Sequence, residues 1–388
     1  MLLSIERWVL HHKNIVYTIT LVAVIFSIFG ILKLKTEGFI VDDLPQTDKI
    51  YTDLKFFEKN FNGVMPLEIV IDTKKRYGLA GSRVLPVLEK IDSLSSYITA
   101  QKEMARPLSI AEGIKFVKQG FYEGDSSYYS IPDSYQAAFL GEYLKPGKDS
   151  GDTKNNLSKL LTSFIDTARE NTRISITMAD VGTKKLPLIL QGIRKRTDEL
   201  FDTSKFKITF TGATITFLEG TSFIINGLKE SILWAFLFIA LCMLYLFRSL
   251  RILICSLIPN VIPLIVTAGI MGWTGVRLKP STVLIFSVAL GIAVDVTIRF
   301  LVNYKQELAS HNFNIKTTVS ETIRHTGLSI VYTSLVLIAG FVIFCFSGFG
   351  GTQSLGWLTS ITLLTASLTN LILLPVLLLD TGKHRHNA

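Results

Sequence analysis

Residues 327–379 decide the fold, and they read GLSIVYTSLVLIAGFVIFCFSGFGGTQSLGWLTSITLLTASLTNLILLPVLLL. This stretch has no Asp, Glu, Lys, Arg or His over 53 positions. A membrane helix needs about 20 apolar residues, so the stretch is long enough for two. The segment Ser347-Gly348-Phe349-Gly350-Gly351 lies near its middle and predicts the turn between them. This part of the chain therefore predicts a pair of transmembrane helices.

Four further apolar stretches predict one span each. They cover residues 15–32, 231–247, 252–276 and 280–301. The first is followed by Lys33 instead of a small-residue cleavage site, which indicates an uncleaved helix. The predicted fold is a membrane all-α bundle of six transmembrane helices with an inserted α+β domain of ferredoxin-like, split βαβ type. The predicted domains are a first helix with a cytoplasmic N-terminus at 1–34, an extracytoplasmic α+β domain at 35–220, a five-helix bundle at 221–380 and a cytoplasmic tail at 381–388.

The composition agrees with a membrane protein. The 388 residues are 48% hydrophobic and 18% charged, with a mean hydropathy of +0.40. The net charge of +9 comes without a basic run interleaved with aromatics, so we expect no nucleic-acid partner. The three cysteines lie in apolar runs, which predicts no disulfide or metal cluster. Residues 141–149 fail the phosphate-loop pattern, and we expect neither an enzyme nor a cofactor.

The short segments between the spans predict the orientation. Nine basic residues lie at one set of helix ends and only Arg277 and Lys279 in the opposite short loop. The nine are Arg7, Lys13, Arg248, Arg251, Lys305, Lys316, Arg324, Lys383 and Arg385. Both termini are therefore expected on the cytoplasmic side of the cell membrane, with the large domain in the periplasm.

The large domain shows alternating strand and helix patterns. Strands are predicted at 67–72, 173–178 and 207–210, and amphipathic helices at 84–98 and 186–201. Two such units predict split βαβ character.

An aromatic-rich segment at 106–152 separates these units. Phe121, Tyr122, Tyr135 and Phe139 lie in it and could line a path for apolar cargo. The alternative interpretation is that they are packing residues of an irregular subdomain.

Asp295 lies deep in the predicted fourth span, where an ionisable group is costly enough to indicate function. Ser287, Gly291 and Asp295 follow at four-residue spacing, so they share one helix face that a neighbouring helix can approach closely. We expect this face to bury the carboxylate, and burial disfavours its charged form, as a reversible proton carrier requires.

Arg299 lies four residues further on, on the same face as Asp295. If it reaches the interface, Asp295 is free to bind protons; if it pairs with Asp295, the two form a static pair.

Two other features concern the helices around this span. Pro259, Asn260 and Pro263 predict a bent third span, either beside a transport pathway or as a merely kinked packing helix. Residues 303–324 mix charged and apolar positions and suit a helix lying on the cytoplasmic surface.

Five ordered segments resemble hallmarks of the resistance-nodulation-division (RND) superfamily, specifically MMPL and hopanoid-exporter-like proteins. They are Phe247-Arg248-Ser249-Leu250-Arg251, Ile258-Pro259-Asn260-Val261-Ile262-Pro263, Met271-Gly272-Trp273-Thr274-Gly275, Gly291-Ile292-Ala293-Val294-Asp295 and Ala339-Gly340-Phe341. Residues 41–45 and 61–63 also resemble the start of such a porter domain, although 41–45 could be a plain acidic loop.

The resemblance implies secondary active export of lipids or other hydrophobic cargo, driven by the proton motive force through Asp295. The second to sixth helices also resemble a sterol-sensing domain. Two positions depart from the exporters, which commonly have a polar residue after the acid and often His four positions on; here they are Val296 and Arg299.

Typical members contain two such units, whereas this sequence contains one. The resemblance thus implies a homodimer or pairing with a second RND half, or one half of a split transporter. The alternative function is a non-transporting lipid- or sterol-sensing or scaffold module with a fixed Asp295–Arg299 pair.

Overall fold

The computed structural model describes residues 2–136 and 163–383, and it separates into two compact units. One unit comprises Met1–Pro45 and Thr221–Ala388, and we call it the helical unit. The other comprises Gln46–Gly220, and we call it the sheet unit.

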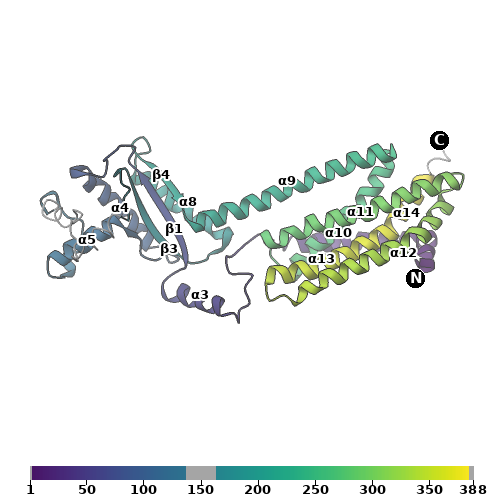
Figure 1. Ribbon diagram of the computed structural model, residues 1–388, viewed down its shortest axis with the longest axis horizontal. Coiled ribbons are helices and arrows are strands. Elements are labelled where there is room, and N and C mark those ends of the chain that lie inside the picture. Colours follow the sequence, from purple (N-terminus) through teal and green to yellow (C-terminus); the bar gives the residue numbers. More distant parts are fainter. Residues whose placement is uncertain (1, 137–162, 384–388) are drawn as a thin grey trace. The chain divides into compact units, whose positions relative to one another are not determined.

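Long helices make up the helical unit (Figure 1). Six of those described are long and apolar enough to cross a membrane, in agreement with the predicted number of spans. The elements are α1 (Leu2–His11), α2 (Lys13–Ile31), α9 (Ala213–Phe247, which begins in the sheet unit), α10 (Leu250–Thr274), α11 (Pro280–Ser310), α12 (Ile315–Val342), η3 (Ile343–Phe346), α13 (Gly350–Leu368), the π-helical turn η4 (Thr369–Leu373) and α14 (Leu374–Lys383).

The predicted turn in the long uncharged stretch is confirmed between η3 and α13. The predicted surface helix at 303–324 is wrong. Helix α11 continues to Ser310, and α12 begins at Ile315 with Asn314 as its N-cap. The mixed charged and apolar pattern therefore belongs to the ends of two long helices. Helix α1 was not predicted from the sequence; its Glu6 accepts a hydrogen bond from Ser320 of α12 and pairs with Arg324 of the same helix.

Small residues allow a close contact between α2 and α10. A Cβ atom added to Gly272 would lie 1.8 Å from the carbonyl oxygen of Gly30, and one added to Gly30 would lie 2.2 Å from that of Gly269. Trp273 then stacks on Phe26 with ring centroids 4.9 Å apart. Without side chains between them, the two backbones approach closely, as small residues allow in membranes.

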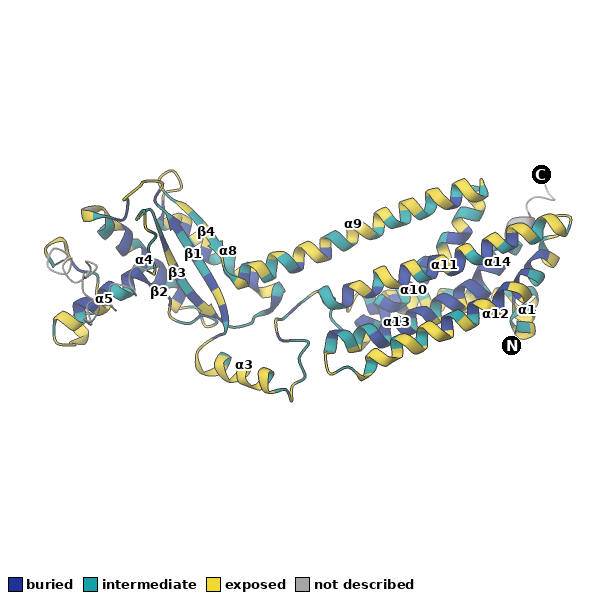
Figure 2. Ribbon diagram, in the orientation of Figure 1, coloured by how far each residue is buried: buried dark blue, intermediate teal, exposed yellow. Residues whose placement is uncertain are grey.

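Burial differs strongly between the helices. Of the 18 residues in the apolar segment of the α13–α14 span, 67% are buried, and in α11 the share is 50%. In α9 only 6% of the corresponding residues are buried (Figure 2). Apolar side chains such as Phe223, Leu233 and Tyr245 lie exposed along α9. An apolar surface of this length matches a lipid environment.

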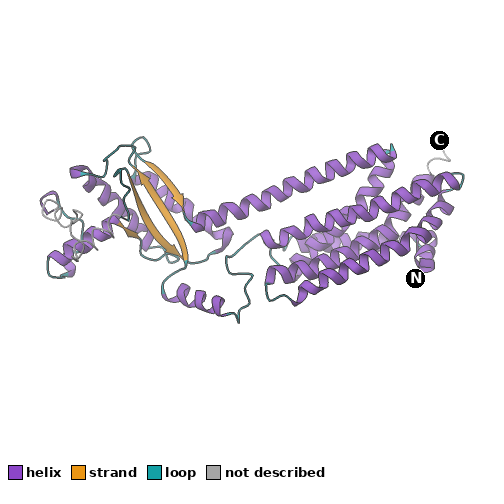
Figure 3. Ribbon diagram, viewed as in Figure 1, coloured by secondary structure: helices purple, strands orange, loops and turns teal. Residues whose placement is uncertain are grey.

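The sheet unit contains one antiparallel four-stranded sheet in the order β2-β3-β1-β4 (Figure 3). The three predicted strands are confirmed. Its elements are α3 (Lys49–Asn60), β1 (Met65–Asp72), η1 (Gly81–Arg83), α4 (Val84–Thr99), β2 (Leu108–Ser109), α5 (Ile110–Phe121), η2 (Ser126–Tyr128), β3 (Asn171–Met178), α8 (Gly182–Leu200) and β4 (Lys207–Thr211). The two predicted amphipathic helices correspond to α4 and α8, while α3, β2 and α5 were not predicted.

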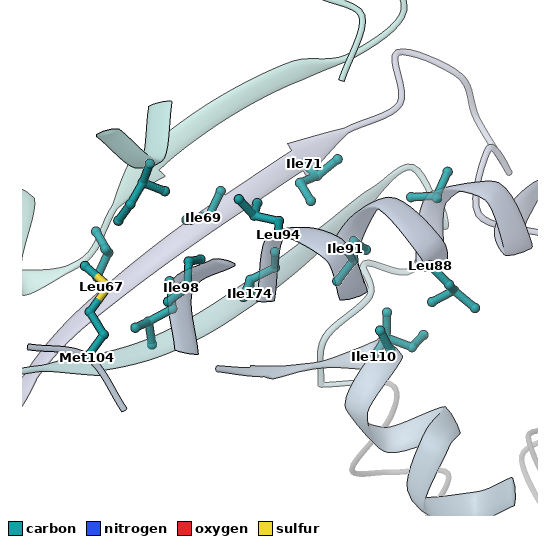
Figure 4. Close-up of a cluster of buried hydrophobic side chains, with 14 of the residues drawn as sticks. Leu67, Ile69, Ile71, Leu88, Ile91, Leu94, Ile98, Met104, Ile110 and Ile174 are labelled. Carbon is teal, nitrogen blue, oxygen red and sulfur yellow. The ribbon is translucent and has the colours of Figure 1, made fainter. Parts of the chain in front are cut away.

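Alternation along the strands places the core of this unit on one face of the sheet. In β1, Leu67, Ile69 and Ile71 are fully buried, while the residues between them are less buried. Figure 4 shows Ile91 and Leu94 of α4 beside these β1 side chains. The period of two in the strands and the period of about 3.6 in α4 therefore bring two apolar faces together.

Candidate functional site

The charged pair inside a membrane-crossing helix lies on α11. Arg299 Nη2 donates a hydrogen bond of 2.6 Å to Asp295 Oδ2. The Asp295 side chain is 64% exposed and that of Arg299 is 39% exposed. Of the two arrangements considered from the sequence, the structure has the ion pair.

The face that carries Asp295 is not covered by any described part of the chain. Gly291 and Ser287, about one and two turns earlier, are also exposed. A Cβ atom added to Gly291 would have no atom within 4 Å. The expectation that this face buries the carboxylate is therefore wrong for a single chain, because α10, α12 and α13 pack against the other sides of α11. The small residues and the acid do share one face, as their spacing predicted.

The opposite side of α11 carries a buried polar network. Thr297 is fully buried and its Oγ1 lies 2.8 Å from Asn260 Oδ1 of α10 and 2.6 Å from Asn370 Oδ1 of η4. Both asparagines are also fully buried. The network thus joins α10, α11 and the span that contains η4. Its α11 member, Thr297, is two residues after Asp295.

Two prolines of α10 shape this network. Pro263 has no N–H, so the carbonyl oxygen of Pro259 lacks its usual helical donor. Thr369 Oγ1 of η4 lies 3.1 Å from that oxygen and 3.0 Å from the Ala366 carbonyl oxygen, so its one hydrogen can be donated to either. Pro259 and Pro263 are both buried. The predicted bend residues therefore contact the network directly.

A second set of charges lies at the other end of α11. Lys279 Nζ is 2.5 Å from Asp43 Oδ1, and Arg277 Nη1 is 3.1 Å from Asp42 Oδ2. Ser281 donates to Asp43 over 3.2 Å, and the Gly350 N–H donates to the Asp43 carbonyl over 2.8 Å. The acidic segment 41–45 thus fastens the chain after α2 to the starts of α11 and α13.

Comparison with known proteins agrees with this architecture. The MMPL family model matches residues 152–388, which include helices α9 to α14, five of the six candidate membrane spans, and both asparagines of the network. The chain belongs to the MMPL family. This family is part of the RND superfamily. A membrane protein of Methanocaldococcus jannaschii is 21% identical over 384 residues, covering 94% of this chain and 90% of the relative.

The family match places Asp295 and the buried network in the matched part of this MMPL protein. The aromatic residues of the proposed cargo path lie outside that part. Phe121 is 49% and Tyr135 81% exposed, while Tyr122 stacks on Tyr128 with centroids 3.9 Å apart. Phe139 lies outside the described residues. The described members therefore lie at or near the surface of the sheet unit, away from its core.

The sequence pattern predicts Asn260 as a site residue but not Thr297, Thr369 or Asn370. For Asn370 the sequence does carry a signal. Asn370 is the single Asn within the uncharged stretch 327–379, and a buried amide in an apolar helix demands a partner. Thr297 is harder to find, because threonine is common in membrane helices and often bonds its own backbone.

Proposed function

We propose that this MMPL protein is a subunit of a secondary active transporter that exports lipids or other hydrophobic molecules across the cytoplasmic membrane, with Asp295 carrying the coupling protons. The observation that carries the proposal is the uncovered face of α11. A carboxylate that is 64% exposed, with Ser287 and Gly291 beside it, lies on a membrane-crossing helix. Left facing lipid, such a group is costly, so a partner or a water-filled path must meet it.

A second copy of the chain is the proposed partner for this face. Small residues allow two α11 helices to approach closely, and a twofold axis would bring the two Asp295 side chains near each other. An Asp295 carboxylate that lies near a second Asp295 and near Arg299 can release Arg299 and pair with the other carboxylate when it takes up a proton. Pairing with a separately encoded RND half would cover the same face in the same way.

The sheet unit is proposed to be a ferredoxin-like porter domain on the periplasmic side. Its strand order β2-β3-β1-β4, with α4 between β1 and β2 and α8 between β3 and β4, supports this assignment. The exposed aromatics Phe121 and Tyr135 would then contact apolar cargo. Both termini would lie in the cytoplasm, as the basic residues of the short loops indicate.

The alternative is a lipid- or sterol-sensing or scaffold module, and the 2.6 Å pair between Arg299 and Asp295 favours it. A fixed pair of this kind would hold α11 without taking part in proton transfer. The two functions differ in whether loss of the Asp295 charge changes proton movement.

Proton flux tests the proposal. Proteoliposomes are made from the total lipid extract of the expression host, which contains the lipids offered as cargo, and hold a trapped pH-sensitive dye. We expect the wild-type protein to dissipate an imposed pH gradient several times faster than protein-free vesicles, and Asp295→Asn to fall to the protein-free rate. Asp53→Asn, at an exposed acid of α3, is the matched control and should retain the wild-type rate. Equal rates for Asp295→Asn and wild type would support the sensor or scaffold.

A further inference from the structure

We propose that Asn260, Thr297, Thr369 and Asn370 form a binding site for a sodium ion in the core of the helical unit. This inference concerns the buried side of α11 and stands independently of the proposed export function. It rests on how the hydrogens and oxygens of these four side chains are distributed.

Thr297 carries one hydroxyl hydrogen but has three oxygens within hydrogen-bond distance. They are Asn260 Oδ1 at 2.8 Å, Asn370 Oδ1 at 2.6 Å and the carbonyl oxygen of Ala293 at 3.0 Å. A hydroxyl donates only one hydrogen bond, so at least one amide oxygen faces the Thr297 oxygen without a hydrogen between them. In a fully buried place such a contact needs a further positive or hydrogen-donating group.

Rotating the amides does not remove the conflict. Asn260 Nδ2 donates to the Ser256 carbonyl over 2.9 Å, and Asn370 Nδ2 donates to the Ala366 carbonyl over 3.0 Å. If either amide were flipped, its oxygen would face a carbonyl oxygen of its own helix. The helices therefore hold both Oδ1 atoms towards Thr297.

All four side chains can direct their hydrogens to their own helices at once. The Thr297 hydroxyl can donate to the Ala293 carbonyl, and the Thr369 hydroxyl can donate to the Ala366 carbonyl 3.0 Å away. The lone pairs of two hydroxyl and two amide oxygens are then free of hydrogens. Oxygens of this kind are the ligands that hard cations prefer, and both Oδ1 atoms lie within 2.8 Å of Thr297 Oγ1, with Thr369 next to Asn370 in the chain.

The backbone near these side chains adds a fifth oxygen. The Pro259 carbonyl lacks its helical donor because Pro263 has no N–H, and it lies 3.1 Å from Thr369 Oγ1. The adjacent η4 is a π-helical turn, a feature often found at functional sites. Interrupted membrane helices supply Na+ ligands in other transporters through such freed carbonyls.

The charge of the site selects a monovalent ion. The five oxygens all belong to neutral groups, so a divalent ion would lose its hydration without a compensating carboxylate. Asp295 lies on the opposite, exposed face of α11. Sodium, a small hard monovalent cation, therefore fits the ligands better than magnesium or calcium.

Binding of 22Na+ to the purified protein in detergent tests the site directly. We expect about one ion per chain, and a rise in Tm of about 3 °C in saturating NaCl over choline chloride at equal ionic strength. Absence of 22Na+ binding by the wild-type protein would overturn the inference without any variant.

Variants locate the ion. Thr297→Val and Asn370→Leu each remove one oxygen ligand and should abolish both 22Na+ binding and the Na+-specific rise in Tm, whereas Thr297→Ser keeps the hydroxyl and should restore them. Thr267→Val alters a buried threonine pair between α10 and α13 and should leave binding unchanged. Asp295→Asn should also bind Na+ normally. Binding that survives Thr297→Val, or that disappears in Asp295→Asn alone, would show that this network is not the site.

Discussion

Asp295 and Thr297 are two residues apart on α11 and lie in opposite environments. The Asp295 carboxylate is 64% exposed and paired with Arg299, whereas Thr297 is fully buried between two asparagines. A separation of two residues rotates side chains by about 200° around a helix, which explains the contrast. One membrane helix thus carries a candidate proton site on one face and a candidate cation site on the other.

The close contact between α2 and α10 predicts the effect of one added methyl group. Gly272→Ala places a Cβ atom against the Gly30 carbonyl, 1.8 Å away before relaxation, so the helices must separate. We expect a loss of about 1–3 kcal/mol, typical of overpacking, measured as a lower Tm of the purified protein. Gly340→Ala, in the open surface of α12, should change Tm little. Equal effects of the two substitutions would show that the α2–α10 contact does not limit stability.

The ion pairs between segment 41–45 and the start of α11 predict a local loss of stability. Lys279→Met leaves Asp43, whose side chain is only 19% exposed, without its cation. We expect about 2 kcal/mol of destabilisation and faster proteolysis near residues 36–45. Lys316→Met, at an exposed position of α12, is the control. If both variants resist protease like the wild type, the pairs do not fasten this segment.

The charge cluster that Glu112 and Lys115 of α5 form with Arg106 and with Asp92 of α4 predicts a pH dependence in the sheet unit. Burial would raise the pKa of Glu112, but hydrogen bonds from Lys115 and Tyr129 and the charges of Lys115 and Arg106 outweigh it and hold that pKa below its ordinary value. A depressed carboxyl pKa stabilises the fold above the unfolded-state value of about 4.3, and this stability is lost as the pH falls through the folded-state pKa.

Hydrogen exchange of the full chain measures this contribution. Glu112→Gln should speed the exchange of α5 amides at pH 7, and the difference from wild type should shrink below about pH 4, where wild-type Glu112 becomes protonated. Glu89→Gln, at an exposed position of α4, should have no such effect. A difference that has already disappeared at about pH 4.5, near the ordinary carboxyl value, would contradict the lowered pKa.

The exposed aromatics of the sheet unit predict a loss of transport without unfolding. Phe121→Gln and Tyr135→Gln should slow gradient dissipation several-fold in the proteoliposome assay while leaving hydrogen exchange of the β1 and α4 core unchanged. Phe56→Gln, at an exposed aromatic of α3, serves as the control. Unfolding of the sheet unit by Phe121→Gln would instead assign these aromatics a packing role.

The sequence predicted those helices and strands that have a clear local pattern of apolar and polar residues. The uncharged stretch 327–379 predicted two helices and their turn, and alternation at 67–72 predicted β1. The two-residue strand β2 was missed because it is too short to show alternation. Residues 303–324 were predicted wrongly because a surface helix and the ends of two membrane-crossing helices show the same mixture of charged and apolar residues at the membrane interface.

The sequence predicted the charged side of the candidate site and, of the buried network, only Asn260 beside Pro259 and Pro263. Asp295 stands out because an acid within an apolar span is rare. Its exposure could not be predicted, since that depends on which sides of α11 its neighbours cover. Nor could the pairing of Thr297 with Asn370, because residues 73 positions apart meet only through the packing of α11 against η4.

Whether a second copy covers the Asp295 face is measured most directly by disulfide cross-linking in native membranes. Gly291→Cys is introduced into a chain whose Cys242, Cys255 and Cys345 are replaced by alanine, and Val336→Cys, 68% exposed on α12, is the control. We predict that mild oxidation joins two copies rapidly through Cys at position 291, because a disulfide requires Cα atoms about 4.4–6.8 Å apart, and joins few through position 336. Cross-linking that is absent at 291, or equally fast at both positions, would contradict a homodimer built on this face.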